Sequence, residues 1–237
     1  MSMHRLLVDI KRLDESSPAL PKEALHHLKV LRIEDGEEVE LFDGKGGYRV
    51  YEWRTCALVA RDPSRMMMVA PKPLTLFACV TKGSRWDWTI EKATELGVTR
   101  IVPVISARTI VRLRKEERAM KRERWLRIAE DAARQSDAKW VPEILEALDF
   151  DDALPLVEKS QCFIGALTTP PSPLLRDAFA NRDGREVAVF IGPEGDFSPE
   201  ELSALMRIAT PVSFGPTILR AETAAIFAVS TISHFLL

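Results

Sequence analysis

The sequence predicts an α/β domain that follows a smaller, β-rich domain, and a change of rhythm along the chain indicates this. After Pro73, apolar strand-like runs alternate with helical patterns, which is typical of a parallel sheet with helices on both faces. Before Ala70, short strand-like runs follow one another and one segment has helical spacing. Between them, residues 70–73 read APKP, and two prolines in four residues resist both helix formation and strand pairing. We therefore expect one domain over residues 1–72 and a second over residues 73–237.

The first domain is expected to be a small barrel of roughly five short strands with one helix. The strand-like runs are HRLLVDI (4–10), EEVELFD (37–43), YRVYEW (48–53), CALVA (56–60) and MMMVA (66–70). A helix is predicted at PKEALHHLKVL (21–31), because a proline starts the segment and its apolar residues have helical spacing. The glycine-rich GKGG (44–47) between two of the runs predicts a hairpin.

The second domain is expected to alternate strands and helices. The strand-like runs are LTLFACV (74–80), RIVPVIS (100–106), CFIGAL (162–167), EVAVFIG (186–192) and PVSF (211–214). The helical segments between them are IEKATELG (90–97), RWLRIAEDAARQS (124–136), SPLLRDAFA (172–180) and SPEELSALMRIA (198–209). Parallel sheets of this kind bind ligands at the loops beyond the carboxyl ends of the strands, so we expect functional residues in those loops.

Composition restricts the possible classes of protein. The apolar fraction of 46% is ordinary for a folded domain, and the formal net charge is −2. A nucleic-acid partner would therefore have to meet a local positive patch. The three cysteines and four histidines have no metal-ligand spacing, so we expect reduced thiols and no metal. The longest apolar stretch, AAIFAVSTISHFLL (224–237), is too short to span a bilayer comfortably, so we expect no membrane contact and a cytoplasmic location.

The segment FIGPEGDFSPEEL (190–202) is the sharpest local feature. An apolar strand runs into IGPEGD (191–196), after which Ser198 can cap a helix that has proline at its first position and a glutamate completing a capping box. A glycine loop at a helix N-terminus usually indicates phosphate, but Glu194 and Asp196 would repel it and the loop has no Lys or Arg. These carboxylates favour a cationic or hydroxyl-rich ligand, and S-adenosylmethionine is both. The alternative is a well-formed turn without a ligand.

The segment FGPTILRAETAAIFAVS (214–230) predicts a second loop and the last helix. A glycine and a proline end a strand, and Ile218 and Leu219 then lie in a loop, where apolar side chains need something to pack against. That partner is an adenine ring or, alternatively, the ordinary core. Arg220 and Glu222 lie beside this apolar pair, and their alternative role is a salt bridge that caps the helix. The helix is apolar on nearly all sides, so we expect it in the core or in an oligomer interface.

Six segments together resemble the SPOUT methyltransferases, and within them the family that methylates N3 of a uridine in 16S ribosomal RNA. They are HHLKVLR (26–32), LFDGKGG (41–47), KGSRWDWTIEKATELGV (82–98), RWLRIAEDAARQSDAKWVPEI (124–144), IGPEGD (191–196) and FGPTILRAETA (214–224). The resemblance spans nearly the whole chain. The sequence departs from the family pattern at Asp196, where a second glycine is usual, at Phe214, where a leucine is usual, at residues 84–86 and at Arg134. None of these departures removes a group that the chemistry requires.

The resemblance implies a SPOUT-type α/β domain with a C-terminal trefoil knot, preceded by a PUA-like β-barrel that binds RNA, and a homodimer. It also implies S-adenosyl-L-methionine as the cofactor, 16S ribosomal RNA or the small ribosomal subunit as the partner, and uracil-N3 methylation as the reaction. The residues implied to bind the cofactor are Leu167, Thr168, Ile191, Gly192, Pro193, Glu194, Gly195, Phe214, Gly215, Ile218, Leu219, Arg220, Thr223 and Ala224.

The chemistry needs one group beyond the methyl donor. Uracil N3 is a weak nucleophile until its proton leaves, and the negative charge then falls on the ring oxygens. Arg220 is the catalytic candidate, because a guanidinium can stabilise that charge, although it stays protonated and is a poor base. Glu222 is the second candidate, either as the proton acceptor or as the group that orients Arg220.

Residues 108–127 predict a strip that binds RNA phosphates. They include nine basic and three acidic residues, so the basic residues are in excess by six. The alternative is a solvated helix with pairs such as Glu117–Lys121 at i,i+4. The candidate RNA-binding residues are Arg5, Arg32, Arg108, Arg112, Arg114, Lys115, Arg118, Lys121 and Arg122. Because N3 takes part in Watson–Crick pairing, the target uridine is expected to be unpaired or flipped out.

Three other functions remain open at this stage. A SPOUT enzyme could act on transfer RNA or on a ribose 2′-hydroxyl instead. A non-catalytic RNA-binding protein is disfavoured by the intact motifs at 191–196 and 214–224. A nucleotide-binding protein is disfavoured because the chain lacks a phosphate-loop lysine and has acidic residues in the glycine loop at 191–196.

Overall fold

The computed structural model describes residues 3–166, 168, 170–180 and 182–236, and it contains two compact units. The first unit consists of Met1–Ala70 with Glu130–Val141, and the second of Pro71–Ala129 with Pro142–Leu237. Residues 130–141 therefore cluster with the N-terminal residues, an arrangement that the prediction of two continuous domains does not include.

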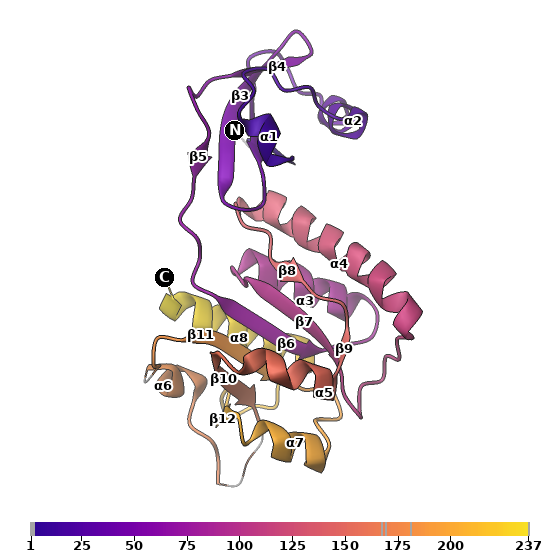
Figure 1. The fold of residues 1–237 in the computed structure, drawn as a ribbon, viewed down its shortest axis with the longest axis vertical. Coiled ribbons are helices and arrows are strands. Elements are labelled where there is room, and N and C mark those ends of the chain that lie inside the picture. Colours follow the sequence, from indigo (N-terminus) through magenta and orange to yellow (C-terminus); the bar gives the residue numbers. More distant parts are fainter. Residues whose placement is uncertain (1–2, 167, 169, 181, 237) are drawn as a thin grey trace. The chain divides into compact units, whose positions relative to one another are not determined.

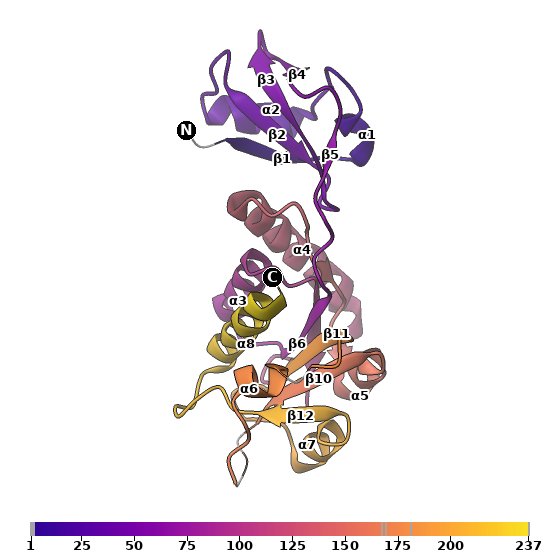
Figure 2. The same cartoon turned by 90° about the vertical axis from the view of Figure 1, so that its left-hand side faces the viewer.

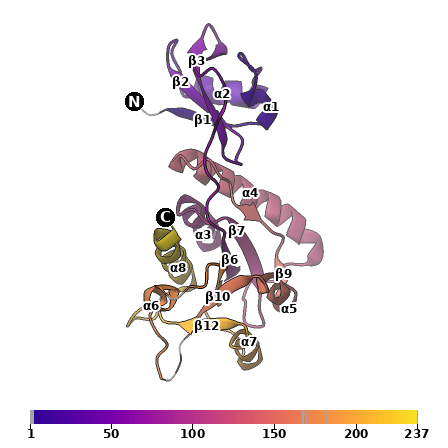
Figure 3. The same ribbon diagram turned by 60° about the vertical axis from the view of Figure 1, so that its left-hand side comes forward.

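The first unit is a β-sheet with two short helices, and Figures 2 and 3 show its strands side by side. The elements are β1 (His4–Leu7), α1 (Ile10–Leu13), α2 (Lys22–Val30), β2 (Glu38–Phe42), β3 (Gly47–Arg54), β4 (Ala57–Ala60) and β5 (Met66–Met67). The sheet order is β1-β2-β3-β4, with β5 also paired to β3, and β1 runs parallel to β2. All five predicted strand runs and the predicted helix are thus present, and α1 is an additional short helix.

A buried arginine ties the turns of the first unit together. Arg49 on β3 is only 5% exposed, and its guanidinium donates hydrogen bonds to the backbone carbonyls of Leu13, Glu15, Asp62 and Pro63. Each of its nitrogens therefore has an acceptor, which removes the usual cost of burying a charge. In the same unit, Lys139 is buried against Glu40, which fastens the loop after the helix Lys115–Ser136 to β2.

The second unit has a seven-stranded, fully parallel sheet in the order β12-β10-β11-β6-β7-β8, with β9 also paired to β7 (Figure 1). The strands are β6 (Leu74–Cys79), β7 (Arg100–Ile105), β8 (Glu143–Ile144), β9 (Leu148–Asp149), β10 (Ser160–Gly165), β11 (Glu186–Ile191) and β12 (Ala209–Val212). The helices are α3 (Ser84–Glu95), α4 (Lys115–Ser136), α5 (Phe150–Ala153), the 3-10 helix η1 (Leu154–Val157), α6 (Leu175–Ala180), α7 (Pro199–Leu205) and α8 (Ala221–Leu236).

Helices cover both faces of this sheet, as the alternating pattern predicts (Figure 2). Helices α3 and α8 pack together on one face, and α5 and α7 lie on the other. Between the layers, Phe77 and Phe190 from the neighbouring strands β6 and β11 stack with ring centroids 4.5 Å apart. All six residues of β6 are buried, which explains why this run is apolar at every position except Thr75 rather than alternating.

The five predicted strands of the second unit are confirmed. Helix α3 begins at Ser84, six residues before the predicted segment at 90, and the larger difference is at α4. Helix α4 begins at Lys115, nine residues before the predicted segment at 124. The prediction began too late because the exposed first half of the helix has charged residues instead of an apolar stripe. The short elements β8, β9, α5 and η1 were not predicted. Each has two to four residues, too few to show a hydrophobic period.

Candidate active site

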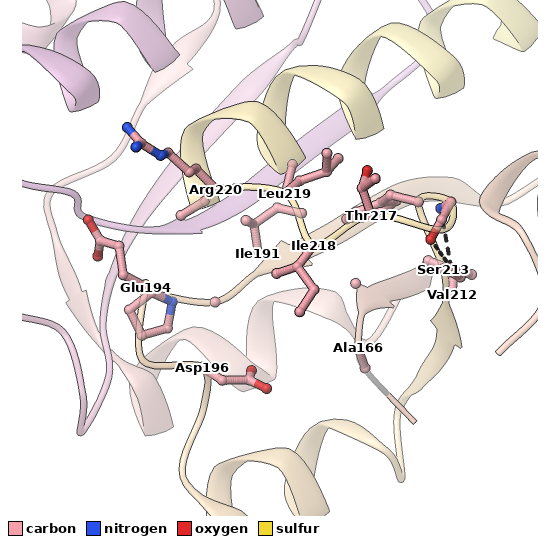
Figure 4. Close-up of a pocket in the computed structure, with 17 residues that line it drawn as sticks. Ala166, Ile191, Glu194, Asp196, Val212, Ser213, Thr217, Ile218, Leu219 and Arg220 are labelled. Atoms are coloured by element: carbon pink, nitrogen blue, oxygen red, sulfur yellow. Dashed lines mark hydrogen bonds between the residues drawn. The ribbon is translucent and has the colours of Figure 1, made fainter. Parts of the chain in front are cut away.

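A pocket of about 330 Å³ lies at the carboxyl ends of β10, β11 and β12 (Figure 4). Because all strands are parallel and these three are neighbours, the segments that leave them meet at one edge of the sheet. The pocket is lined by Gly165, Ala166, Ile191, Gly192, Pro193, Glu194, Asp196, Val212, Ser213, Phe214, Gly215, Thr217, Ile218, Leu219, Arg220, Ala221 and Ala224. Its size is within the usual range for small-molecule sites, which is roughly 300–1,000 Å³.

The glycine loop, residues 191–196, forms one wall of the pocket and is fixed by local hydrogen bonds. The backbone N–H of Asp196 donates to Pro193 O at 2.9 Å, and its own carboxylate accepts from the next N–H at 2.7 Å. Ser198 then caps α7 in the predicted capping box with Glu201. Asp196 has φ of 60°, in the left-handed region, so the residue that replaces the usual glycine still adopts a conformation that glycine favours.

The second loop, residues 213–220, forms the opposite wall. Gly215 has φ of 123°, which only glycine adopts readily, and Ser213 accepts a hydrogen bond from its N–H. Ile218 is 80% exposed although it is apolar, and Figure 4 shows it beside Ile191 and Leu219. Such an exposed apolar wall is suited to a flat, partly apolar ligand.

Most of the cofactor-binding residues named from the sequence meet at this pocket. Those that line it are Ile191, Gly192, Pro193, Glu194, Phe214, Gly215, Ile218, Leu219, Arg220 and Ala224. Gly195, Thr168 and Thr223 do not line it: Gly195 accepts a hydrogen bond from Arg108, Thr168 bonds to Ser172, and Thr223 is exposed on α8. Leu167 lies outside the described residues.

Six further lining residues were not singled out from the sequence, namely Gly165, Ala166, Val212, Ser213, Thr217 and Ala221, and Asp196 was singled out for its charge but not included among the cofactor-binding residues. Gly165 has a clear structural reason, because a Cβ there would overlap the ring of Phe214. The signal for Gly165 was its place at the end of a strand that neighbours the glycine loop. The neighbour relation between β10 and β12 is not visible in the sequence.

Arg220 and Glu222 have different surroundings. Arg220 is exposed and lines the pocket, and Figure 4 shows it at the same end as Glu194. Glu222 is 9% exposed and lines a smaller cavity that shares Ile191 and Ala221 with the pocket, together with Thr81 and Trp86. Among the described residues its ion-pair partner is Arg85, at 3.8 Å from Nε to Oε1, and not Arg220.

Three buried polar atoms around the smaller cavity make no hydrogen bond within the described chain. They are Glu222 Oε2, Thr81 Oγ1 and Trp86 Nε1. Cys79 also lines this cavity, and burial raises the pKa of its thiol to about 12. The thiol therefore stays protonated at neutral pH and is unsuited to nucleophilic catalysis.

The basic segment, residues 108–127, does not act as one uniform surface. Arg118 donates to Ala147 O at 2.9 Å and pairs with Asp149 at 2.6 Å, and its side chain is only 12% exposed. Arg122 donates to Ile144 O at 2.7 Å. Both guanidinium groups thus support β8, β9 and the turn between them, which accounts for part of the predicted charge excess.

Other predicted RNA-binding residues are also partly engaged. Arg112 donates to Ala107 O at 2.9 Å, and in the first unit Arg5 lies 2.9 Å from Asp137 and 3.5 Å from Glu40. Arg114 pairs with Glu117 at 3.3 Å but keeps 81% of its side chain exposed. Arg32 and Lys115 are exposed as well, whereas Lys121 is half-buried.

The structure describes residues 3–236 apart from 167, 169 and 181. There, no group of three or more His, Cys, Asp or Glu side chains is placed to hold a metal ion. No helix in those ranges is long and apolar enough to cross a membrane.

Known proteins resemble this chain along both units. The RNA methyltransferase domain family matches residues 69–233, and the RNA methyltransferase PUA domain matches residues 20–52. The ribosomal RNA small subunit methyltransferase E of Synechocystis is 31% identical, with 98% of this chain and 78% of that protein covered. The same-named protein of Bacillus subtilis is 28% identical, with 98% and 96% covered.

Solved structures agree with the sequence relatives. A methyltransferase of Legionella pneumophila in complex with S-adenosylmethionine has a TM-score of 0.85 at 29% identity, and the match covers 99% of this chain and 98% of that one. The ribosomal RNA small subunit methyltransferase E of Neisseria gonorrhoeae, bound to the same cofactor, has a TM-score of 0.84 at 27% identity and the same coverage. With the parallel sheet and the pocket at its carboxyl edge, these matches establish that the chain belongs to the RNA methyltransferase family of the ribosomal RNA small subunit methyltransferases E.

Proposed function

We propose that this chain transfers a methyl group from S-adenosylmethionine to N3 of a uridine in 16S ribosomal RNA. The observation that carries the proposal is the pocket between the glycine loop and the second loop, where an apolar wall and two carboxylates lie together. The named relatives support the choice of ribosomal RNA of the small subunit as the substrate. The specific nitrogen is carried by the family resemblance.

The pocket residues fit the cofactor chemically. Ile191, Ile218 and Leu219 offer apolar surface for an adenine ring, and Glu194 and Asp196 offer acceptors for ribose hydroxyls and a favourable field for a sulfonium cation. When bound, the cofactor supplies an activated methyl carbon. The residues proposed to hold it are those of the sequence prediction that line the pocket, with Asp196, Ser213 and Thr217 added.

Arg220 is proposed as the catalytic residue. It lines the pocket and is exposed, so its guanidinium can reach a uracil ring beside the cofactor site and stabilise negative charge on the ring oxygens. Glu222 is less suited to accept the N3 proton, because its side chain lines the smaller cavity and its nearest cation is Arg85. We therefore propose that Glu222 is a positioning residue. The N3 proton of the uridine then passes to an acceptor other than Arg220 and Glu222.

RNA contact is proposed for the exposed basic residues Arg32, Arg114 and Lys115 and for the half-buried Lys121. Their phosphate contacts would position the RNA, and the target uridine would have to leave its base pair before N3 is accessible. The homodimer, the trefoil knot, the domain boundary at residues 72 and 73, the RNA-binding role of the first domain and a cytoplasmic location also belong to this proposal.

Two measurements test the proposal. Ribosomal RNA from cells that lack the protein should lose one methyluridine by mass spectrometry, and purified protein with S-adenosylmethionine should restore it. Calorimetry should show saturable binding of S-adenosylmethionine to the pure protein. If the methylation pattern is unchanged and no binding is measured, the proposal is wrong.

The role of Arg220 is tested by Arg220→Ala. Turnover should fall about 100-fold or more, because a group that stabilises developing charge is lost, while cofactor binding changes far less. Unchanged turnover would exclude Arg220 from catalysis. Arg220→Lys keeps the charge without the planar fork and should recover only part of the activity.

A further inference from the structure

Two arginines outside the pocket lining contact the glycine loop. Arg85 lies near the start of α3, and its Nη1 is 3.4 Å from Glu194 Oε1. Arg108 lies in the segment after β7, and its Nη1 donates to Gly195 O at 2.9 Å. Two consecutive residues of the loop are therefore held by side chains from other parts of the chain.

The sheet order explains why these arginines reach the loop. β11, which leads into the glycine loop, pairs with β6, and β6 pairs with β7 in the same parallel sense. The segments after these three strands therefore leave the sheet at the same edge. Arg85 follows β6 and Arg108 follows β7, so each arginine comes from the segment after one of the next two strands along the sheet.

Arg85 also connects the glycine loop to α8. Its Nε lies 3.8 Å from Oε1 of Glu222, a carboxylate that is 9% exposed on the first turn of α8. The second loop runs directly into α8. One guanidinium thus lies between two acidic residues, one on the glycine loop and one on the helix that follows the second loop.

The loop needs support because part of its backbone is unfavourable. Asp196 has φ of 60°, and a non-glycine residue in the left-handed region persists when surrounding contacts hold it there. The hydrogen bond from Arg108 acts on the residue directly before Asp196. The Gly195 carbonyl belongs to the peptide that joins Gly195 to Asp196, so the hydrogen bond restricts the rotation of that peptide.

We propose that Arg85 and Arg108 are positioning residues that hold the glycine loop in the shape that binds the methyl donor. The proposal rests on the proposed cofactor site. It gives Arg108 a task other than the phosphate contact predicted from the sequence, and it gives Glu222 a task through Arg85. Neither arginine lines the pocket, so neither is a catalytic residue.

The two contacts should differ in strength. The Arg108 bond has the usual length of 2.9 Å and, although it is exposed to solvent, goes to a carbonyl whose position matters directly for the loop. The Arg85 pair is longer, and 47% of the arginine side chain and 28% of the glutamate side chain are exposed, so solvent weakens it. Loss of Arg108 should therefore weaken cofactor binding roughly three- to tenfold, and loss of Arg85 about two- to threefold.

The experiment uses Arg108→Ala, Arg108→Lys and Arg85→Gln, with Arg100→Gln as the matched control. Arg100 pairs with Glu143 at 2.7 Å at the amino end of β7, the sheet edge away from the pocket. Calorimetry gives the affinity for S-adenosylmethionine, methyl transfer gives KM and kcat, and thermal melting reports folding. We expect KM for the donor to rise in the Arg108 and Arg85 variants while kcat at saturating donor stays within about twofold.

Two further results sharpen the test. Arg108→Lys should recover part of the affinity lost in Arg108→Ala, because an ammonium can still donate to the carbonyl, and it serves as the folded variant if alanine destabilises the chain. Arg85→Gln should have a smaller effect in a Glu194→Gln background, since the partner on the glycine loop has been removed and only Glu222 remains.

The proposal is overturned if wild-type protein binds the donor and Arg108→Ala binds it equally well. It is also overturned if Arg100→Gln weakens binding as much as the loop variants do, because the effect would then be general. If the wild-type protein itself does not bind the donor, the proposed function fails first and this inference fails with it.

Discussion

The glycine loop and the basic segment were both predicted from the sequence as functional, but their residues are arranged differently in the structure. Residues of the glycine loop and of the second loop come together in one pocket. Residues of the basic segment divide, because Arg118 and Arg122 are used inside the protein whereas Arg114 and Lys115 are exposed. The first prediction used position relative to strand ends, and the second used only the number of charges.

This difference follows from what each signal contains. The end of a parallel strand fixes where the next residues lie, because the sheet brings all its carboxyl ends to one edge. The number of arginines does not indicate where their side chains lie, and an arginine can lie against a backbone carbonyl as readily as it faces solvent. Position along a strand therefore predicts a site better than local composition does.

The largest effect is expected for Arg118→Ala, which tests whether the residues of the basic segment have different roles. The guanidinium is 12% exposed and bonds Ala147 O and Asp149, so its loss should lower the free energy of unfolding by about 2 kcal/mol. Arg114→Ala removes an arginine that is 81% exposed and should leave the melting temperature unchanged. Chemical denaturation of the two variants measures this contrast.

RNA binding should show the reverse order. Arg114→Ala should reduce the slope of log affinity against log salt by about 1, because one phosphate contact is lost, whereas Arg118→Ala should leave that slope unchanged. An Arg118→Ala protein of normal stability and reduced salt slope would contradict the division of the basic segment.

A smaller effect is expected at the pocket for Gly165→Ala. The new Cβ would overlap the ring of Phe214, which lines the pocket, so the ring has to shift. Affinity for S-adenosylmethionine should fall about tenfold, as measured by calorimetry, because a misplaced side chain in a formed pocket costs roughly 1–3 kcal/mol.

A compensating variant controls the Gly165 prediction. Phe214→Leu removes the ring, so Gly165→Ala combined with Phe214→Leu should bind the donor nearly as well as Phe214→Leu alone. Equal losses in both backgrounds would mean that the alanine acts in some other way than through the ring.

The sequence predicted five strands of the second unit, their parallel sense and the loop of the glycine-bearing motif, because these depend on patterns within a few residues. It did not indicate that Gly165 must leave room for Phe214, since their contact depends on the pairing of β10 with β12. It also did not indicate that Arg108 holds Gly195, a contact between residues that are distant along the chain. Long-range pairing is set by the topology of the sheet, which a local pattern does not contain.

The buried polar groups give the same lesson in the first unit. Arg49 and Lys139 are charged residues that a composition argument would place at the surface, yet each is 5% exposed and fully engaged. Arg49 donates to backbone carbonyls of distant residues, and Lys139 pairs with the distant Glu40 as well as with the nearby Asp137, so no spacing along the sequence marks either of them as buried.

The smallest effect is expected for Asp196→Asn, which separates the charge of the glycine loop from its shape. Asparagine tolerates the left-handed conformation at φ of 60° and keeps an oxygen that accepts the hydrogen bond from the Phe197 N–H. Only the negative charge is lost.

S-adenosylmethionine has a sulfonium cation that the demethylated product lacks, so affinity for the donor should fall about two- to threefold while affinity for the product stays the same. Calorimetry with both ligands measures the ratio, and higher salt should reduce the difference, because Asp196 is exposed and salt screens its charge. Equal losses for both ligands would mean that Asp196 acts through the shape of the loop. The contrast between the pocket, predicted from strand ends, and the basic segment, predicted from its charge, would then depend on geometry alone.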